Sequence, residues 1–232
     1  MQPDINVAIL ENHQGTIDGY TYRLNMIPGI NIKATCTFAE EIENVLAKDH
    51  VDLLISGIDI RVSKNNWNPF PILYYIGRIR EQKPEIKLLV ISYIHQQPLV
   101  RSLFEAGVNG FILKEDQKSI QNLGKIVEVI ASGGVFYSEE IHQSLYTNSP
   151  SINFTKRQYE ALSLCASFPD EDTFSLAKRL NISGSTFRNI LSAIYGKLGV
   201  RTRAAAIFKA RQMGVIPLLS MSEEYHSTNK IE

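Results

Sequence analysis

Short apolar runs alternate with stretches of helical spacing over the first 131 residues. In 39–47, for example, Ile42, Val45 and Leu46 fall on one helix face. The apolar runs predict strands at 7–10, 32–36, 51–58, 88–91 and 110–113. The amphipathic stretches predict helices at 17–27, 39–47, 73–79, 98–106 and 120–131.

The predicted strands are continuously apolar rather than alternating. Such strands belong to parallel sheets that are covered by helices on both faces. Five strands and five helices in this order predict an α/β, flavodoxin-like, doubly wound fold, in which the functional crevice lies at the carboxyl ends of the strands.

The second half of the chain has only helical patterns. Thr155 opens a helix as its N-cap, with Gln158 three residues later as the capping-box partner. Further helices are predicted at 173–180, 185–198 and 202–213. The third of these four helices has one apolar stripe: Phe187, Ile190, Leu191, Ile194 and Leu198. Its opposite face is polar near the N-terminus, as a helix-turn-helix reader requires.

These patterns predict an α/β domain at 1–138, a linker at 139–152, an all-α domain of four helices at 153–219 and a polar tail at 220–232. The chain has zero net charge, but residues 1–138 carry 13 basic and 15 acidic side chains, whereas residues 151–219 carry 10 and 4. A compact basic unit joined to a near-neutral one indicates binding to a polyanion such as nucleic acid.

Several classes of protein are disfavoured by the sequence. The apolar runs are too short to span a bilayer, and no secretion leader is recognisable, so we expect a cytoplasmic protein without membrane partners. Cys36 and Cys165 lie 129 positions apart and imply no disulfide framework. There is no metal-ligand cluster, glycine-rich phosphate loop or nucleophile–base pair, so we expect no enzyme, cofactor or bound metal.

The residues at the predicted carboxyl ends of the strands resemble a response-regulator receiver domain. Glu11-Asn12 follows the first strand, Ser92 ends the fourth, and Lys114 ends the fifth after the stretch 103–113. In that family two acids after the first strand bind magnesium and an aspartate after the third strand accepts phosphate. A Ser or Thr and a Lys then contact the phosphoryl group.

The receiver resemblance is degenerate. The family's acid pair is Glu11 and Asn12, and counting from Asp52 places the phosphoacceptor position at Gly57. Magnesium prefers carboxylate oxygens, and only one of three carboxylates remains. Asp59 is a displaced candidate acceptor, but in a continuing strand it would lie roughly 6–7 Å further out. We therefore expect no aspartyl phosphorylation, with these pocket residues as relics: Glu11, Asn12, Ser92 and Lys114.

The helical part resembles the LuxR-type helix-turn-helix through residues 176–183, Thr186 and residues 194–204. With the receiver-like part, nearly the whole chain resembles response regulators of the NarL/FixJ type. The long segment 63–71 before the third helix is similar to the RcsB branch of that family, a weaker match. Its Trp67 and Phe70 either pack back onto the domain or form a contact for a partner.

The resemblance implies roles in binding double-stranded DNA. The base-reading positions are Arg188, Asn189 and Ser192. The phosphate-contacting positions are Thr186, Lys197, Arg201 and Arg203. Arginine suits bidentate contact with guanine and asparagine suits adenine, whereas phosphate contacts fix the register of the protein without reading sequence.

Two features depart from the family pattern. The segment 168–172 before the second helix is longer and acidic, which suits the helix dipole but places negative charge close to phosphate. Gly196 replaces a usual Arg or Lys in the reading helix, and a glycine in a helix interior costs about 1 kcal/mol relative to alanine.

Together these features predict a sequence-specific DNA-binding transcription regulator that is independent of aspartyl phosphorylation. We expect it to act as a homodimer or as a heterodimer with a related regulator, with the helix at 202–213 in the contact through Ala205, Ile207, Phe208 and Ala210. The alternative is a protein-interaction module that pairs with a phosphorylatable regulator and binds DNA weakly alone.

Overall fold

The computed structural model describes residues 4–146 and 152–217. Its N-terminal part is built on a parallel sheet with the strand order β2-β1-β3-β6-β7-β8. The strands are β1 (Ile5–Leu10), β2 (Ile30–Cys36), β3 (Leu53–Ser56), β6 (Lys87–Ser92), β7 (Gly110–Leu113) and β8 (Phe136–Tyr137). The first five strands have the flavodoxin-like order, which confirms the predicted fold class.

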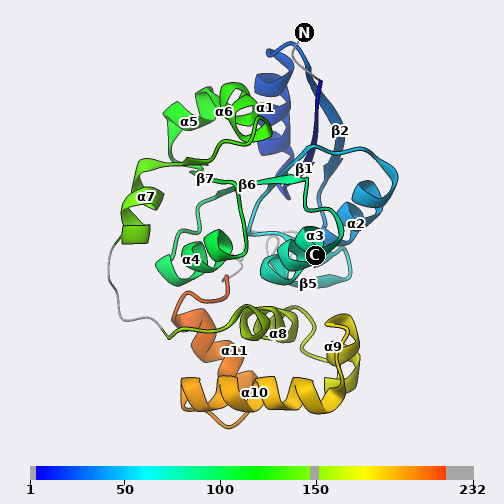
Figure 1. Cartoon of the computed structure of the whole chain (residues 1–232), viewed down its shortest axis with the longest axis vertical. Helices are drawn as coiled ribbons and strands as arrows, with labels where there is room; N and C mark the ends of the chain where they lie inside the picture. Colours follow the sequence, from blue (N-terminus) through cyan, green and yellow to red (C-terminus); the bar gives the residue numbers. More distant parts are fainter. Residues whose placement is uncertain (1–3, 147–151, 218–232) are drawn as a thin grey trace, which may run out of the picture.

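Helices cover both faces of this sheet (Figure 1). On one face, Val7 and Ile9 of β1 share a core with α1 and α6, whereas Ala8 and Leu10 face the core formed with α2, α3 and α4. The helices are α1 (Gln14–Asn25), α2 (Ala39–Lys48), α3 (Ile72–Gln82), α4 (Gln97–Glu105), α5 (Gln117–Gln121) and α6 (Leu123–Ala131). Both faces of the central strands β3 and β7 are therefore buried, as their continuous apolar runs predicted, whereas the edge strand β2 is exposed at every second residue.

The structure differs from the predicted elements in several places. The sheet has a sixth strand, β8, whose two residues are too few to produce a periodic signal. The third strand ends at Ser56 rather than at residue 58. The segment predicted as a linker begins with helix α7 (Glu139–Tyr146), whose Ile141 is buried in the core. The rest of that segment up to residue 151, and the predicted tail, lie outside the described residues.

The segment before α3 forms a β-hairpin of β4 (Arg61–Ser63) and β5 (Asn66–Pro69). Its two aromatic residues separate. Phe70, just after the hairpin, is buried and lies 4.7 Å from Tyr75, between ring centroids. Trp67 remains 52% exposed beneath the guanidinium of Arg61, which lies 3.7 Å from the ring centroid. One aromatic residue thus packs back onto the domain and the other stays on the surface.

The C-terminal part consists of α8 (Lys156–Ser167), α9 (Thr173–Arg179), α10 (Gly184–Leu198) and α11 (Arg203–Gln212). Each helix begins at a side-chain N-cap: Thr155, Asp172, Ser183 and Thr202. The predicted capping box between Thr155 and Gln158 is confirmed. Such caps fix where a helix starts because they satisfy backbone N–H groups that have no partner within the helix.

The two parts form one body, in which α8 lies against α3 (Figure 1). One continuous hydrophobic cluster runs from the α2–α3–α4 side of the sheet into the four C-terminal helices. Among the described residues, no helix is long and apolar enough to cross a membrane.

Candidate nucleic-acid interface and receiver pocket

Helix α10 separates a buried stripe from an exposed polar face. Phe187, Leu191, Ile194 and Leu198 are buried against the other helices. The predicted base-reading residues Arg188, Asn189 and Ser192 are all exposed. They lie together near the start of the helix because positions three or four apart share one helix face.

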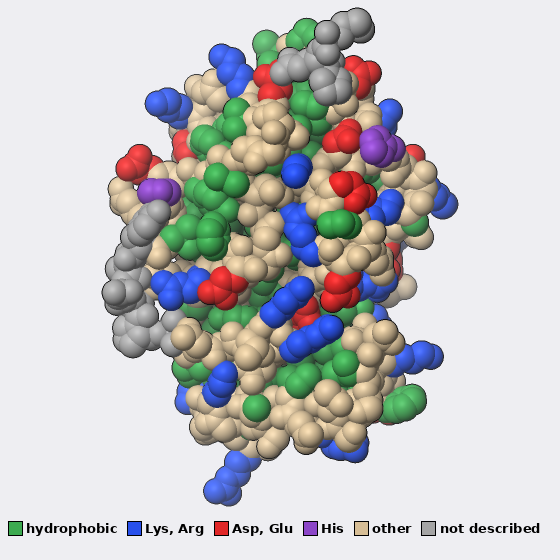
Figure 2. Space-filling model, in the orientation of Figure 1, with side chains coloured by type: hydrophobic (Ala, Val, Ile, Leu, Met, Phe, Trp, Pro, Cys, Tyr) green, Lys and Arg blue, Asp and Glu red, His purple; other side chains and the backbone are tan. Residues whose placement is uncertain are grey.

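The exposed face of α10 lies at the end of the molecule farthest from the sheet (Figure 1). Lys and Arg side chains project from this end (Figure 2). At the start of α10, the hydroxyl of Ser183 accepts a hydrogen bond from the backbone N–H of Thr186 at 3.1 Å. The Thr186 hydroxyl lies 2.8 Å from the same oxygen, so Thr186 stands where the helix dipole favours a phosphate.

Two of the predicted phosphate-contacting residues have partners inside the domain. Lys197 Nζ donates to the carbonyl of Asn153 at 2.5 Å and to Oε1 of Gln158 at 2.8 Å. The guanidinium of Arg203 donates to the carbonyls of Glu171 at 2.6 Å and Pro169 at 2.5 Å. These two cations hold the start of α8 and the loop before α9, a function that the sequence pattern did not indicate.

The other predicted cations are available to a ligand. Arg188 and Arg201 are exposed. Within the described part of the chain, neither has a hydrogen bond or an ion pair to another side chain. Their guanidinium groups therefore need not break internal bonds in order to bind DNA.

Two of the three acids in the loop before α9 have partners inside the domain. Asp172 caps α9 by accepting a bond from the N–H of Ser175 at 2.7 Å, and this backbone bond holds the pKa of Asp172 below its usual value. Glu171 accepts two short bonds from Arg179, at 2.6 and 3.0 Å. Only Asp170 of the three acids is left without such a contact among the described residues, and only the charge of Glu171 is paired with a cation.

The surroundings of two residues in the helical part, Gly196 and Phe174, could not be predicted from the sequence. A Cβ added to Gly196 would meet no atom within 4 Å, so a side chain fits there without a clash. Phe174, the second residue of α9, is 71% exposed. Helical spacing did not signal this exposure, because Phe174 lies three positions before the buried Ala177 and thus on the same side of the helix.

In the N-terminal part, the predicted receiver residues do come together. Glu11, Asn12, Gly57, Ser92 and Lys114 line one pocket of about 200 Å³ at the carboxyl ends of β1, β3, β6 and β7. Glu11 is 1% exposed, and its Oε2 accepts from Lys114 Nζ at 2.7 Å. Ser92 is also buried, and its hydroxyl accepts from the N–H of Ile94 at 3.0 Å.

The phosphoacceptor position is crowded by a neighbour. A Cβ at Gly57 would lie 3.0 Å from Cδ1 of the buried Ile60 and 3.4 Å from Oε2 of Glu11. The chain turns away after Ser56 instead of continuing as a strand, so Asp59 lines the same pocket. The expectation that Asp59 lies further out along an extended strand is therefore wrong. No group of three or more His, Cys, Asp or Glu side chains in the described residues is arranged to hold a metal ion.

Comparisons with known proteins agree with this two-part architecture. No family model matches the chain. The transcriptional regulatory protein DesR of Bacillus subtilis is 23% identical over 210 residues, which cover 90% of this chain and 98% of DesR. DegU of Brevibacillus brevis is 24% identical over 236 residues, which cover 90% of this chain and 94% of DegU.

Solved structures of RcsB share the fold. RcsB from Salmonella enterica serovar Typhimurium bound to a promoter has a TM-score of 0.58 at 20% identity, covering 91% of this chain and 99% of RcsB. A second RcsB–DNA complex has a TM-score of 0.56 at 19% identity, with coverages of 89% and 97%. The sequence relatives of this chain are thus transcriptional regulatory proteins, and its fold is similar to that of the response regulator RcsB.

Proposed function

We propose that this chain is a sequence-specific DNA-binding transcription regulator whose activity does not depend on an aspartyl phosphate. Its sequence relatives are transcriptional regulatory proteins. The observation that carries the proposal is the polar face of α10. Arg188, Asn189 and Ser192 lie on this face, and no other described residue covers it. A protein with this role works in the cytoplasm.

Base reading falls to the exposed row of α10. Arg188 supplies a fork of donors that matches the O6 and N7 acceptors of guanine, and the Asn189 amide matches the N6 and N7 groups of adenine. Ser192, one turn after Arg188, contacts a neighbouring base through a hydroxyl that both donates and accepts.

Phosphate contacts fix the register of α10 in the groove. Thr186 lies at the start of α10 and Arg201 just beyond its end, so the two side chains contact phosphates near opposite ends of this helix. Lys197 and Arg203 use their donors inside the domain. We therefore assign them an indirect effect on DNA binding, through the positions of α8 and of the loop before α9.

Independence from phosphorylation rests on three features of the receiver pocket. Gly57 has no nucleophile, Asn12 lacks the charge of the second metal-binding acid, and Lys114 is held by Glu11. A phosphoryl group would add nearly two negative charges beside a buried carboxylate. Asp59 lines the pocket and is therefore the one acid to exclude by experiment.

Selection of binding sites from random duplex DNA by the purified chain tests the proposed function. We expect a defined consensus sequence and an affinity that falls steeply with salt, because cationic contacts release counterions. Enrichment of no sequence, with only weak salt-dependent binding, would contradict sequence-specific recognition.

A second candidate is a partner module that binds DNA well only when paired with a related regulator. It is favoured by Phe208, which is 64% exposed on α11. Of the predicted dimer residues, Ala210 is buried inside its own domain and Ala205 and Ile207 are half-buried, so Phe208 would carry most of the contact. Sedimentation with and without a related regulator, at concentrations that bind DNA, separates the homodimer from the heterodimer.

A further inference from the structure

Helices α3 and α8 meet at Gly77, where an added side chain would collide with side chains of α8. A Cβ on Gly77 of α3 would overlap Oε1 of Glu160 and would lie 3.5 Å from Cε of Lys156, both on α8. Glu160 is buried at this contact and is held by Arg157, whose Nη1 lies 3.0 Å from Oε2. The closeness of the two helices thus depends on the absence of a side chain at residue 77.

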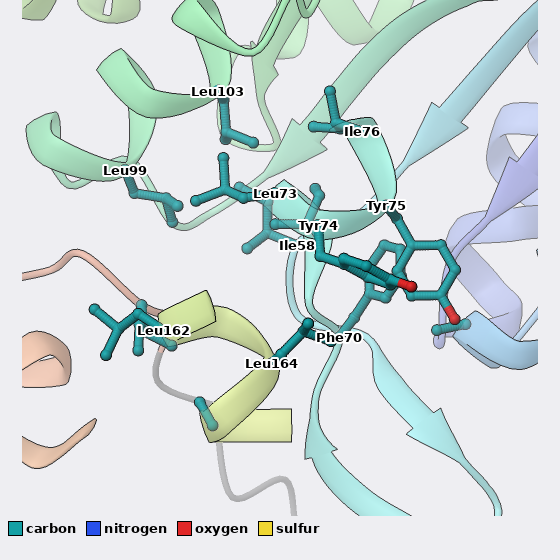
Figure 3. Packing of buried hydrophobic residues seen from close by; sticks show 14 of the residues in the cluster. Ile58, Phe70, Leu73, Tyr74, Tyr75, Ile76, Leu99, Leu103, Leu162 and Leu164 are labelled. Carbon is teal, nitrogen blue, oxygen red and sulfur yellow. The ribbon is translucent and has the colours of Figure 1, made fainter. Parts of the chain in front are cut away.

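An apolar layer continues from this contact. Phe70 before α3, Leu73 of α3 and Leu99 of α4 pack against Leu162 of α8 (Figure 3). Ile216, beyond α11, belongs to the same layer. The space left between them is about 10 Å³, which is no more than room for a single water molecule. This apolar layer is therefore packed like a protein interior. Beside it, a polar cleft of about 420 Å³ lies between α3 and the helices α8 and α9, with Gly77 and Glu160 in its lining.

Three hydrogen bonds fasten this apolar layer. Ser167 at the end of α8 is fully buried, and its hydroxyl donates to the carbonyl of Pro69 in the hairpin at 2.5 Å. Asn66 Nδ2, also in the hairpin, donates to the carbonyl of Ser167 at 3.0 Å. Tyr74 of α3 donates to the carbonyl of Arg179 at 2.9 Å. The β4–β5 hairpin thus holds the end of α8, while Tyr74 of α3 holds the end of α9.

Two further contacts extend the boundary to its edges. Arg157 of α8 lies 3.7 Å from Glu81 of α3, and charged side chains of both signs follow the boundary on the face shown in Figure 2. A Cβ on Gly214 would lie 2.6 Å from Cβ of Gln96, in the loop after β6. The same loop begins at Ser92 and Tyr93, so the receiver pocket adjoins the packed boundary.

This docking leaves the DNA-reading face open. The contacts come from α8, from the carboxyl end of α9 and from residues beyond α11, whereas α10 lies on the opposite side of the helical part (Figure 1). Arg188, Asn189 and Ser192 are exposed while all of these contacts are formed.

We propose that α8 is permanently docked on α3 and the β4–β5 hairpin, and that the chain binds DNA in this closed arrangement without a domain-opening step. The part concerning DNA rests on the proposed function. The Gly77–Glu160 contact and the hydrogen bonds between the hairpin and Ser167 keep the relation between the two parts fixed.

A wedge at Gly77 tests the proposal in the full chain. Gly77→Leu should push α8 away from α3 and raise the radius of gyration measured by small-angle X-ray scattering. Gly19→Leu is the matched control, because Gly19 lies on the exposed side of α1 with no atom within 4 Å of an added Cβ. Leucine favours a helix more than glycine at both sites, so a difference between the variants reports the contact.

The affinity of the same variants for a selected DNA half-site decides whether docking is compatible with binding. We expect Gly77→Leu and Gly19→Leu to bind within twofold of the unaltered chain. A tenfold or greater gain for Gly77→Leu would overturn the proposal, because the contact would then be autoinhibitory. A folded Gly77→Leu protein with an unchanged radius of gyration would overturn the docking itself.

If Gly77→Leu does not fold, a second pair of variants tests the same contact. Gly77→Ala alone should loosen the docking, and adding Glu160→Ala should restore the compact form because the overlapping carboxylate is gone. Absence of this rescue would contradict the assigned contact. If the unaltered chain binds no DNA, the proposed function fails, whereas the scattering of these variants still decides the docking.

Discussion

Glu11 and Lys114 form a buried ion pair at the place where the chain resembles a phosphate-receiving pocket. Lys114 Nζ lies 2.7 Å from Oε2 of Glu11, and the two side chains are 11% and 2% exposed. The second carboxylate oxygen of Glu11 accepts from the N–H of His13 at 3.1 Å. The cation that would contact a phosphoryl group is thus already bonded to a neighbouring acid.

Removing one partner of this pair should destabilise the fold. Lys114→Met leaves a buried carboxylate without its cation, and the free energy of unfolding should fall by about 3 kcal/mol. The double variant Glu11→Gln with Lys114→Met should lose less, because no charge remains buried. Urea unfolding measures both, with Lys125→Met on the exposed side of α6 as the control. Equal losses for the single and double variants would argue against a coupled pair.

The receiver pocket should not accept a phosphoryl group. After incubation with acetyl phosphate and magnesium, the intact mass of the chain should be unchanged, because Gly57 offers no nucleophile and Asn12 adds no charge for the metal. DNA binding should also be unaffected by this treatment. An added phosphate that is labile to hydroxylamine and lost in Asp59→Ala would identify Asp59 as a displaced acceptor.

Arg188 and Arg201 should differ in the kind of DNA binding that they support. Arg188→Ala should cost about 1–3 kcal/mol on the selected site and relax the preference at one base position. Arg201→Ala should weaken binding to all sequences alike and reduce the slope of affinity against salt by about one. Fluorescence anisotropy on selected and scrambled duplexes compares them. Equal losses on both duplexes for Arg188→Ala would remove that residue from base reading.

Gly196 should tolerate a side chain. It lies inside α10, exposed, with no atom within 4 Å of an added Cβ. Gly196→Ala should therefore stabilise the fold by about 1 kcal/mol, which corresponds to a rise in Tm of about 2–4 °C for a chain of this size. Calorimetry measures the shift. A fall in Tm would mean that the residue needs a conformation or contact that only glycine allows.

Local sequence determined most of the secondary structure. Thr155 and Gln158 form the predicted capping box because a cap depends only on residues three positions apart. The stripe from Phe187 to Leu198 determined which side of α10 is buried, because helical spacing alone places those side chains on one face. The parallel sheet followed from continuous apolar strands, although the two-residue β8 was too short to be recognised.

Tertiary structure decided which of these groups remain free to act. Lys197 and Arg203 were predicted to contact phosphates on the same grounds as Arg201. In the structure, however, they donate to backbone and side-chain oxygens of their own domain. Asp59 lies in the pocket because the chain turns after Ser56. Glu160, 83 positions away in the sequence, packs onto Gly77, in the space that a side chain at residue 77 would occupy. The spacing of apolar residues predicts which face of a helix or strand is buried. It does not predict which residues distant in sequence contact that face, because these contacts depend on the packing of the whole chain.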